Sequence, residues 1–173
     1  ASEALRPSDA AHDGSLFGEG AGARMLEAAA SAAQRGAPIM GEVLGGGYVN
    51  EGLGLLAIRE DGDGLARAIA IALDDAGLNA ADVGMIVAHG NGTPQSDVSE
   101  AAALRTVFGA TMPPVTGFKW AFGHLIAAAG ILDPVLALAA LKAKVVPGIA
   151  TLRSLDEACA GLQVCAQACT PRS

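Results

Sequence analysis

Apolar residues along the chain fall into short runs that glycine, proline and acidic residues separate, and the spacing of these runs predicts alternating strands and helices. Leu65, Ile69 and Leu73 recur at helical spacing and predict an amphipathic helix over residues 64–76, which Gly77 ends. The apolar run 83–88 predicts a short buried strand, and residues 94–108 follow it as a second helix.

The remaining runs extend this alternation along the chain, and alternation at this spacing is typical of a sheet covered by helices. We therefore expect an α/β fold with a largely parallel or mixed sheet layered between helices. The sequence predicts a polar loop at 1–16, strands at 17–27 and 39–48, a helix at 27–35, a loop at 49–63, and closing strands at 145–149 and 162–165.

Residues 115–144 are predicted to be a strand, a tight loop and a long helix. The helix is apolar on nearly every face, which indicates that it is buried all round. Asp133 and Pro134 interrupt it, and its uninterrupted apolar runs fall short of the roughly 20 residues of a membrane span. We therefore expect a core helix and no membrane span.

Composition narrows the function classes. Hydrophobic residues make up 51% of the chain and aromatic residues only 3%, so the core must consist of Ala, Val, Leu and Ile. The net charge of −7, without any basic block, argues against a nucleic-acid-binding surface. We find no signal peptide, and we expect a cytoplasmic location. Cys159, Cys165 and Cys169 match neither a disulfide framework nor a zinc site, and we expect reduced packing cysteines.

Two histidines and a lysine are expected at one edge of the sheet. His89 directly follows the strand at 83–88, and Lys119 and His124 follow the next strand. A histidine at a helix N-terminus is biased toward the neutral form, which can donate a hydrogen bond to a carbonyl oxygen and hold developing negative charge. The alternative is that His124 only caps the helix. His12 lies in the polar loop and is expected to be solvated.

Other chemistries fit the sequence less well. Ser96, Thr93 and Thr116 are candidate nucleophiles, but no activating elbow surrounds them. A metal site is disfavoured because Lys119 would repel a cation and because the spacing matches no standard site. Its candidate ligands would be His89, His124, Asp97 and Glu100.

Four ordered motifs resemble the β-ketoacyl synthase family. Residues 6–22 resemble its pattern RPFDxxRDGxxxGEGAG, residues 89–100 resemble HGTGTPxxDxxE, residues 119–124 resemble KSxxGH, and residues 145–152 resemble VVPxTxNL. The resemblance covers almost the whole chain. It implies the C-terminal half of a thiolase-fold condensing enzyme, with residues 1–173 forming one such domain.

The resemblance implies a decarboxylative Claisen condensation of an acyl thioester with malonyl-acyl carrier protein. It places malonyl decarboxylation on His89 and His124. Lys119 is expected to order the site, with Glu100 as its partner and Asp97 in support, and Thr93 is expected to contact the pantetheine arm. The expected partners are acyl carrier protein and a second synthase subunit, in a homodimer or heterodimer. No cofactor is implied, since the phosphopantetheine arm carries the substrates.

Several residues depart from the family pattern. Asn91 replaces the first threonine of HGTGT, bulky residues including Phe122 fill the loop before His124, and His12 stands where the family has arginine. Asn91 and Phe122 are expected to bind substrate together with Thr93. The family's nucleophilic cysteine and its final glycine-rich strands match nothing in this sequence, so we expect the chain to be inactive alone. The alternative interpretation is a non-catalytic partner subunit of the chain-length-factor type.

Overall fold

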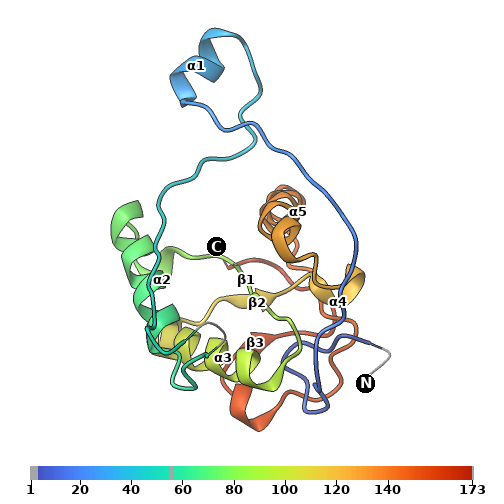
Figure 1. Ribbon diagram of the computed structural model, residues 1–173. Helices are drawn as coiled ribbons and strands as arrows, with labels where there is room; N and C mark the ends of the chain where they lie inside the picture. Colours follow the sequence, from blue (N-terminus) through green and yellow to red (C-terminus); the bar gives the residue numbers. More distant parts are fainter. Residues whose placement is uncertain (1–3, 55–56, 173) are drawn as a thin grey trace.

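A three-stranded parallel sheet lies at the centre of the body, in the order β1-β2-β3 (Figure 1). The computed structural model describes residues 4–54 and 57–172, so part of the predicted loop at 49–63 lies outside the described residues. Val115 in the central strand stands opposite both Ile86 and Val164. The strands are β1 (Ile86–Val87), β2 (Pro114–Thr116) and β3 (Gln163–Val164).

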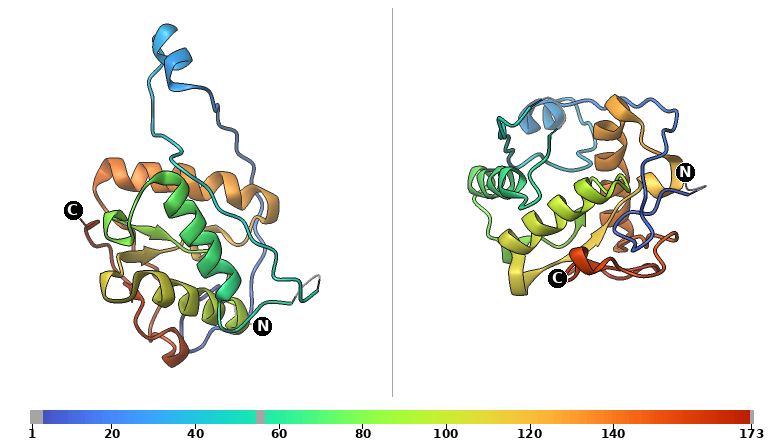
Figure 2. Two further views of the ribbon diagram at one scale, coloured as in Figure 1. Left: turned by 90° about the vertical axis from the view of Figure 1, so that its left-hand side faces the viewer. Right: turned by 60° about the horizontal axis from the view of Figure 1, so that its bottom comes forward.

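Helices cover both faces of this sheet, which confirms the predicted α/β layering (Figure 2). α3 (Pro94–Phe108) lies on one face with α2 (Asp63–Ala76) packed against it, and α5 (Ala129–Ala143) lies on the other. The predicted bounds of α3 are confirmed, with Pro94 at its first turn. Gly77 ends α2 with φ +65°, as its C-cap position requires.

The main core forms between α3, the sheet and the C-terminal segment. Fully or nearly buried side chains from these elements make one cluster, and Ile69 of α2 and Ile86 of β1 pack against it. Four of the seven are Ala, Val or Leu, as the composition predicts, and the others are one phenylalanine, one methionine and one cysteine. The cluster consists of Ala101, Leu104, Phe108, Met112, Val115, Cys159 and Leu162.

Shorter helices connect these layers. α1 and α4 are short α-helices, and the connections contain single turns of 3₁₀-helix. The predicted strand at 145–149 is not formed; Val146 makes only an isolated antiparallel bridge with Cys169. The bounds are α1 (Ala29–Gln34), α4 (Lys119–Phe122), η1 (Ala80–Asp82), η2 (Gly109–Thr111), η3 (Ile126–Ala128) and η4 (Glu157–Cys159).

Two extended segments, residues 17–28 and 37–50, leave the body and meet at α1; we call them the two arms (Figure 1). The sequence predicts strands here, but the described residues contain no ladder in either arm, and the strand predictions are wrong. A strand exists only where a neighbour supplies hydrogen-bond partners, and the first arm has just one bridge, between Phe17 and His124. Most arm residues are exposed.

The arms nevertheless keep the two-residue period of a strand on the face that touches the body. A Cβ added at Gly20 would contact Leu125, and one added at Gly22 would contact Ile131. These alternate glycines lie against α5 and the turn before it, while the intervening side chains point away. The glycine-rich stretch is therefore a close-packing device, as its composition predicts.

α5 is not buried all round, which corrects the prediction. Only Ala129 and Ala140 are buried within it, and Val135, Leu138 and Leu141 are exposed. Its uniform apolarity predicted burial, but within the described residues only part of its surface has neighbours. Ile126–Ala143 is long and apolar enough to cross a membrane by length and composition, with a mean hydropathy of 1.8 and 11% of it buried. That it is not a span stays a prediction.

Candidate functional site

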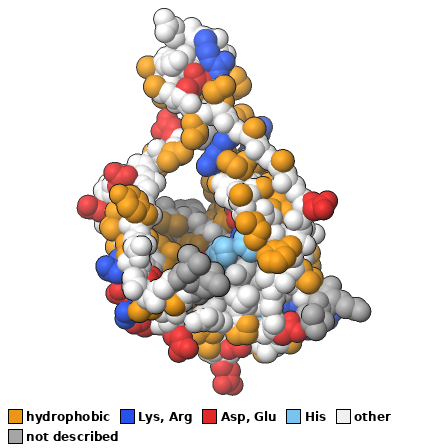
Figure 3. Space-filling view, in the orientation of Figure 1, with side chains coloured by type: hydrophobic (Ala, Val, Ile, Leu, Met, Phe, Trp, Pro, Cys, Tyr) orange, Lys and Arg blue, Asp and Glu red, His pale blue; other side chains and the backbone are white. Residues whose placement is uncertain are grey.

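His89 and His124 come together at one edge of the sheet, as the sequence predicts. His89 lies two residues after β1, and His124 lies two residues after α4. Their ring centroids are 5.1 Å apart and their planes meet at 85°, edge to face. Histidine side chains reach the surface at the base of a hollow between the arms, beside hydrophobic groups (Figure 3).

The first turns of α3 hold the loop that carries His89. The Glu100 carboxylate accepts hydrogen bonds from the backbone N–H groups of His89 at 2.7 Å and Gly90 at 3.0 Å. Gly90 and Gly92 have φ of +47° and +78°, which residues with a Cβ rarely adopt. The two glycines and the carboxylate together fix the direction in which His89 leaves the strand.

His124 has a defined tautomer. Its Nδ1 accepts a hydrogen bond from the Ile126 backbone N–H at 3.2 Å, so the ring proton must sit on Nε2. α5 begins only at Ala129, so His124 does not cap the long helix; its ring contacts the N–H of Ile126, the first residue of the intervening 3₁₀ turn. This contact uses one ring nitrogen and leaves the other as a donor.

Lys119 is buried and paired with a different acid from the one the resemblance implied. Its side chain is 1% exposed, and Nζ lies 2.9 Å from Oδ2 of Asp133. Both carboxylate oxygens of the expected partner, Glu100, instead accept hydrogen bonds from backbone N–H groups. Asp133 projects from α5, so the ion pair ties that helix to α4.

Both site histidines are held in the neutral form. Loss of hydration, followed by the positive charge of Lys119, lowers the pKa of His89 below its usual 6.5. The same two causes lower the pKa of His124. The direction agrees with the sequence prediction, although the predicted cause was a helix dipole. At neutral pH each ring therefore has one N–H donor.

The remaining predicted residues surround this pair. Asn91 Oδ1 accepts hydrogen bonds from Thr93 N at 3.0 Å and from Thr93 Oγ1 at 2.8 Å, which closes a tight turn in the His89 loop. Phe122 is half-buried at the end of α4. Asp97 is buried inside α3 and accepts the Gly92 N–H, so it supports the loop from below rather than lining it.

Sequence reasoning missed three neighbours of the site. Phe17 is 76% exposed and its ring lies 6.4 Å from the ring of His124. Asp133 interrupts the apolar sequence of the predicted helix, and a carboxylate at such a position is itself a signal of a buried cation. His12 is buried, not solvated; its ring contacts Asp97 and Asp156. Asp97 lies at the start of a helix, where an acidic residue is common, so the sequence gives no sign of its contact with His12, 85 positions away.

A metal centre is not assembled here. Within residues 4–54 and 57–172, no three His, Cys, Asp or Glu side chains are placed to hold a metal ion together. All three cysteines are free thiols; Cys159 packs in the core, while Cys165 is exposed and Cys169 is half-buried.

Comparison with known proteins identifies the family. Residues 40–153 match the family described as beta-ketoacyl synthase, C-terminal domain. The chain is 33% identical over 153 residues to 3-oxoacyl-[acyl-carrier-protein] synthase 2 of Mycobacterium bovis, covering 88% of this chain and 37% of that protein. It is 37% identical over 149 residues to the protein of the same name from Staphylococcus aureus, covering 84% of this chain and 36% of the relative.

Solved structures share the fold. The ishigamide ketosynthase/chain length factor superposes with a TM-score of 0.91 at 36% identity, covering 98% of this chain and 42% of that one. The structure of a type II PKS acyl-carrier protein in complex with its ketosynthase bound to the hexaketide superposes with a TM-score of 0.91 at 31% identity, covering 96% of this chain and 41% of that one. The chain thus spans about two fifths of the relatives it matches. It belongs to the β-ketoacyl synthase family and has the C-terminal half of the thiolase-like fold.

Proposed function

We propose that this chain supplies the decarboxylation site of a β-ketoacyl synthase, which condenses an acyl thioester with malonyl-acyl carrier protein. The observation that carries the proposal is the pairing of His89 and His124, two neutral rings in edge-to-face contact at the surface. Each offers an N–H donor, and the tautomer of His124 is fixed by the Ile126 N–H. Two N–H donors on neighbouring rings suit a thioester carbonyl oxygen.

The proposed chemistry follows from these donors. The malonyl thioester oxygen accepts hydrogen bonds from both rings. The carboxylate leaves as CO₂, and the electron pair of the broken C–C bond passes into an enolate whose negative charge gathers on the held oxygen. The enolate carbon attacks the carbonyl of the acyl thioester, and the thiolate of the acyl-accepting cysteine leaves. Donors aimed at developing charge are each worth roughly a hundredfold to a thousandfold in rate.

Other residues support this step. Loss of hydration, followed by the charge of Lys119, lowers the pKa of both rings, so that they donate without bringing a fixed charge. Thr93 is proposed to contact the pantetheine arm of the acyl carrier protein, and no further cofactor is invoked. The acyl-accepting cysteine is proposed to come from outside this sequence, so the chain alone is expected to be inactive. The whole protein is proposed to act as a dimer in the cytoplasm.

The test measures decarboxylation of malonyl-acyl carrier protein by the complete protein that contains this chain. His89→Ala and His124→Ala should each lower the rate by roughly a hundredfold or more. Asp74→Asn changes an exposed acid far from the rings and serves as the control. Decarboxylation that survives both histidine substitutions would refute the proposal.

A second candidate is a non-catalytic partner subunit, favoured by the likeness to a ketosynthase/chain length factor pair. The same assay separates the two. A partner subunit would give no decarboxylation without an active synthase, and its His89→Ala variant would leave the activity of the assembled pair unchanged. Because His89, Lys119 and His124 are all present and assembled, the catalytic subunit is the better supported candidate.

A further inference from the structure

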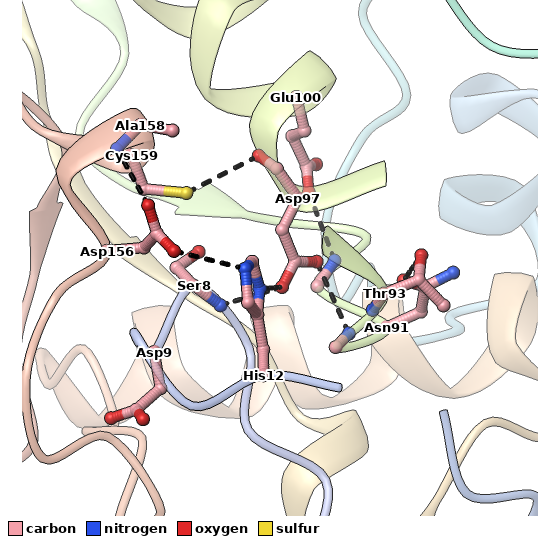
Figure 4. Close-up of polar contacts among 12 residues, drawn as sticks. Ser8, Asp9, His12, Asn91, Thr93, Asp97, Glu100, Asp156, Ala158 and Cys159 are labelled. Atoms are coloured by element: carbon pink, nitrogen blue, oxygen red, sulfur yellow. Dashed lines mark hydrogen bonds and ion pairs between the residues drawn. The ribbon is translucent and has the colours of Figure 1, made fainter. Parts of the chain in front are cut away.

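His12 lies buried between two carboxylates that belong to different elements (Figure 4). Its Nδ1 is 2.9 Å from Oδ2 of Asp97 in α3, and its Nε2 is 3.3 Å from Oδ2 of Asp156, the N-cap of η4. The side chains of His12 and Asp97 are 4% and 0% exposed. A buried ring with an acid on each nitrogen is not a solvated loop residue.

The two contacts define the charge that suits this position. A neutral imidazole has one N–H and can donate to only one of the two acids, whereas an imidazolium donates to both. Within the described residues, His12 is the only Lys, Arg or His side chain within ion-pair distance of Asp97. An ionised carboxylate with no exposure is costly unless a cation and hydrogen bonds compensate it. The His12 ring, in contact with Asp97 and Asp156, is the group placed to supply that compensation.

The neighbouring titratable groups do not replace it. Burial raises the pKa of the Cys159 thiol to about 11, so it stays protonated; its Sγ lies 3.8 Å from the Asp97 backbone carbonyl oxygen. Asp9 is directed elsewhere and accepts hydrogen bonds from the Arg153 and Ser154 N–H groups. Asp97 and Asp156 are thus the acids that face the ring.

Asp97 connects His12 to the loop that carries His89. Its Oδ2 accepts the Ser8 N–H at 2.8 Å, and its Oδ1 accepts the Gly92 N–H at 3.3 Å (Figure 4). Gly92 is further clamped by its carbonyl oxygen, which accepts the Gly14 N–H at 3.0 Å. A Cβ at Gly92 would lie 2.8 Å from the Gly14 oxygen, so the contact leaves no slack.

We propose that His12 is a positioning residue whose positive charge fixes Asp97 and, through it, the loop that carries His89. The chain from ring to carboxylate to Gly92 N–H reaches within three residues of His89. The role in loop order stands on these contacts alone, and its effect on catalysis rests on the proposed decarboxylation. The resembled family has arginine at this position, which is a permanent cation.

The experiment compares His12→Gln, which removes the charge and keeps a polar group, with His12→Arg, which keeps a cation. In the complete protein, amide hydrogen exchange over residues 89–93 should speed up about tenfold in His12→Gln, because the loss of a charge-assisted hydrogen bond costs about 1.4 kcal/mol or more. The kcat for malonyl decarboxylation should fall by a similar factor with little change in KM. His12→Arg should restore both.

A milder variant guards against misfolding. Asp156→Asn retains an oxygen to cap η4 at the Ala158 N–H but removes one acid from the ring. It should raise exchange in the loop by about threefold, in keeping with a partly exposed pair. Unchanged exchange in both His12→Gln and Asp156→Asn would overturn the inference, as would His12→Arg being as damaging as His12→Gln. Absent decarboxylation in the unmutated protein would refute the proposed function while leaving the exchange result readable.

Discussion

Replacing Lys119 by Met tests whether the buried ion pair stabilises the site. Met keeps the length of the side chain and removes the ammonium group, which is 2.9 Å from Asp133. The Asp133 carboxylate then keeps its charge with no partner, and its second oxygen, Oδ1, is already buried without a hydrogen bond among the described residues. The substitution therefore isolates a charge rather than merely deleting a contact.

The expected loss follows from the exposure of the two partners. Removing one member of a fully buried pair costs roughly 3–5 kcal/mol. The Lys119 side chain is 1% exposed, but Asp133 retains 19% exposure, so water relieves part of the unpaired charge. We expect a loss at the lower end, about 3 kcal/mol in the free energy of opening around α4 and α5. Removing the Lys119 charge should also raise the pKa of both site histidines.

Native-state hydrogen exchange on the complete protein measures this local free energy directly. Lys142→Met is the matched control, because Lys142 is an exposed lysine in the last turn of α5 and its loss should change stability by about 0.5 kcal/mol or less. Lys119→Met combined with Asp133→Leu should recover most of the stability, since a hydrophobic pair can replace a buried ion pair at little cost.

Two outcomes would refute this reasoning. One is a loss below about 1 kcal/mol in Lys119→Met, the value typical of a solvated surface pair. The other is a double variant no more stable than Lys119→Met alone, which would show that the unpaired Asp133 charge is not what destabilises the protein.

Three further predictions concern the histidine site. Because the pKa values of His89 and His124 are lowered from 6.5, the unfolded chain takes up protons at a higher pH than the folded chain does. The free energy of unfolding should therefore fall as the pH drops below 6.5, until both rings are also protonated in the folded protein. The plot of unfolding free energy against pH should be flatter for the double variant His89→Gln/His124→Gln. Gly18→Ala should cut decarboxylation at least tenfold, because the new Cβ overlaps a carbonyl oxygen in the loop before His124. Glu100→Gln can accept from only one of two N–H groups, and should speed amide exchange in the His89 loop about tenfold.

Each of these has its own control. Urea unfolding between pH 8 and 5 gives the first result, and equal slopes in the unmutated protein and the variant would contradict it. Gly46→Ala matches Gly18→Ala, since a Cβ at Gly46 meets nothing within 4 Å and should leave activity intact. For Glu100→Gln, exchange in α2 should stay unchanged; a uniform rise would indicate global destabilisation instead.

Local signals were strong enough to predict the helices on one side of the sheet. Pro94 fixes the start of α3, and Gly77 fixes the end of α2; both act through backbone geometry that no distant contact alters. The approach of His89 to His124 was also predictable, because parallel strands bring their carboxyl ends to one edge. The structure has this parallel pairing between β1 and β2, and the two histidines therefore lie close together.

Contacts between distant segments could not be predicted. Both Glu100 and Asp133 were available to Lys119, and the choice depends on where α5 crosses the site, which spacing alone does not show. Burial of His12 depends on Asp97 and Asp156, which lie 85 and 144 positions further along the chain. The strand predictions for the arms are wrong for another reason. β-propensity shows that a segment suits a sheet, but the hydrogen-bond pairing that makes a strand depends on neighbouring segments.

We expect the open backbones of the two arms to control the kinetics of assembly. They carry apolar side chains such as Met25, Leu44 and Tyr48 in solvent, and each can add a strand. We therefore expect their pairing with further strands to follow formation of the α3 core. If the complementary strands belong to the same polypeptide, the slow refolding phase should be first order; if a second subunit supplies them, its rate should rise with protein concentration. Stopped-flow refolding at two concentrations distinguishes a single-chain synthase from one assembled from separate pieces.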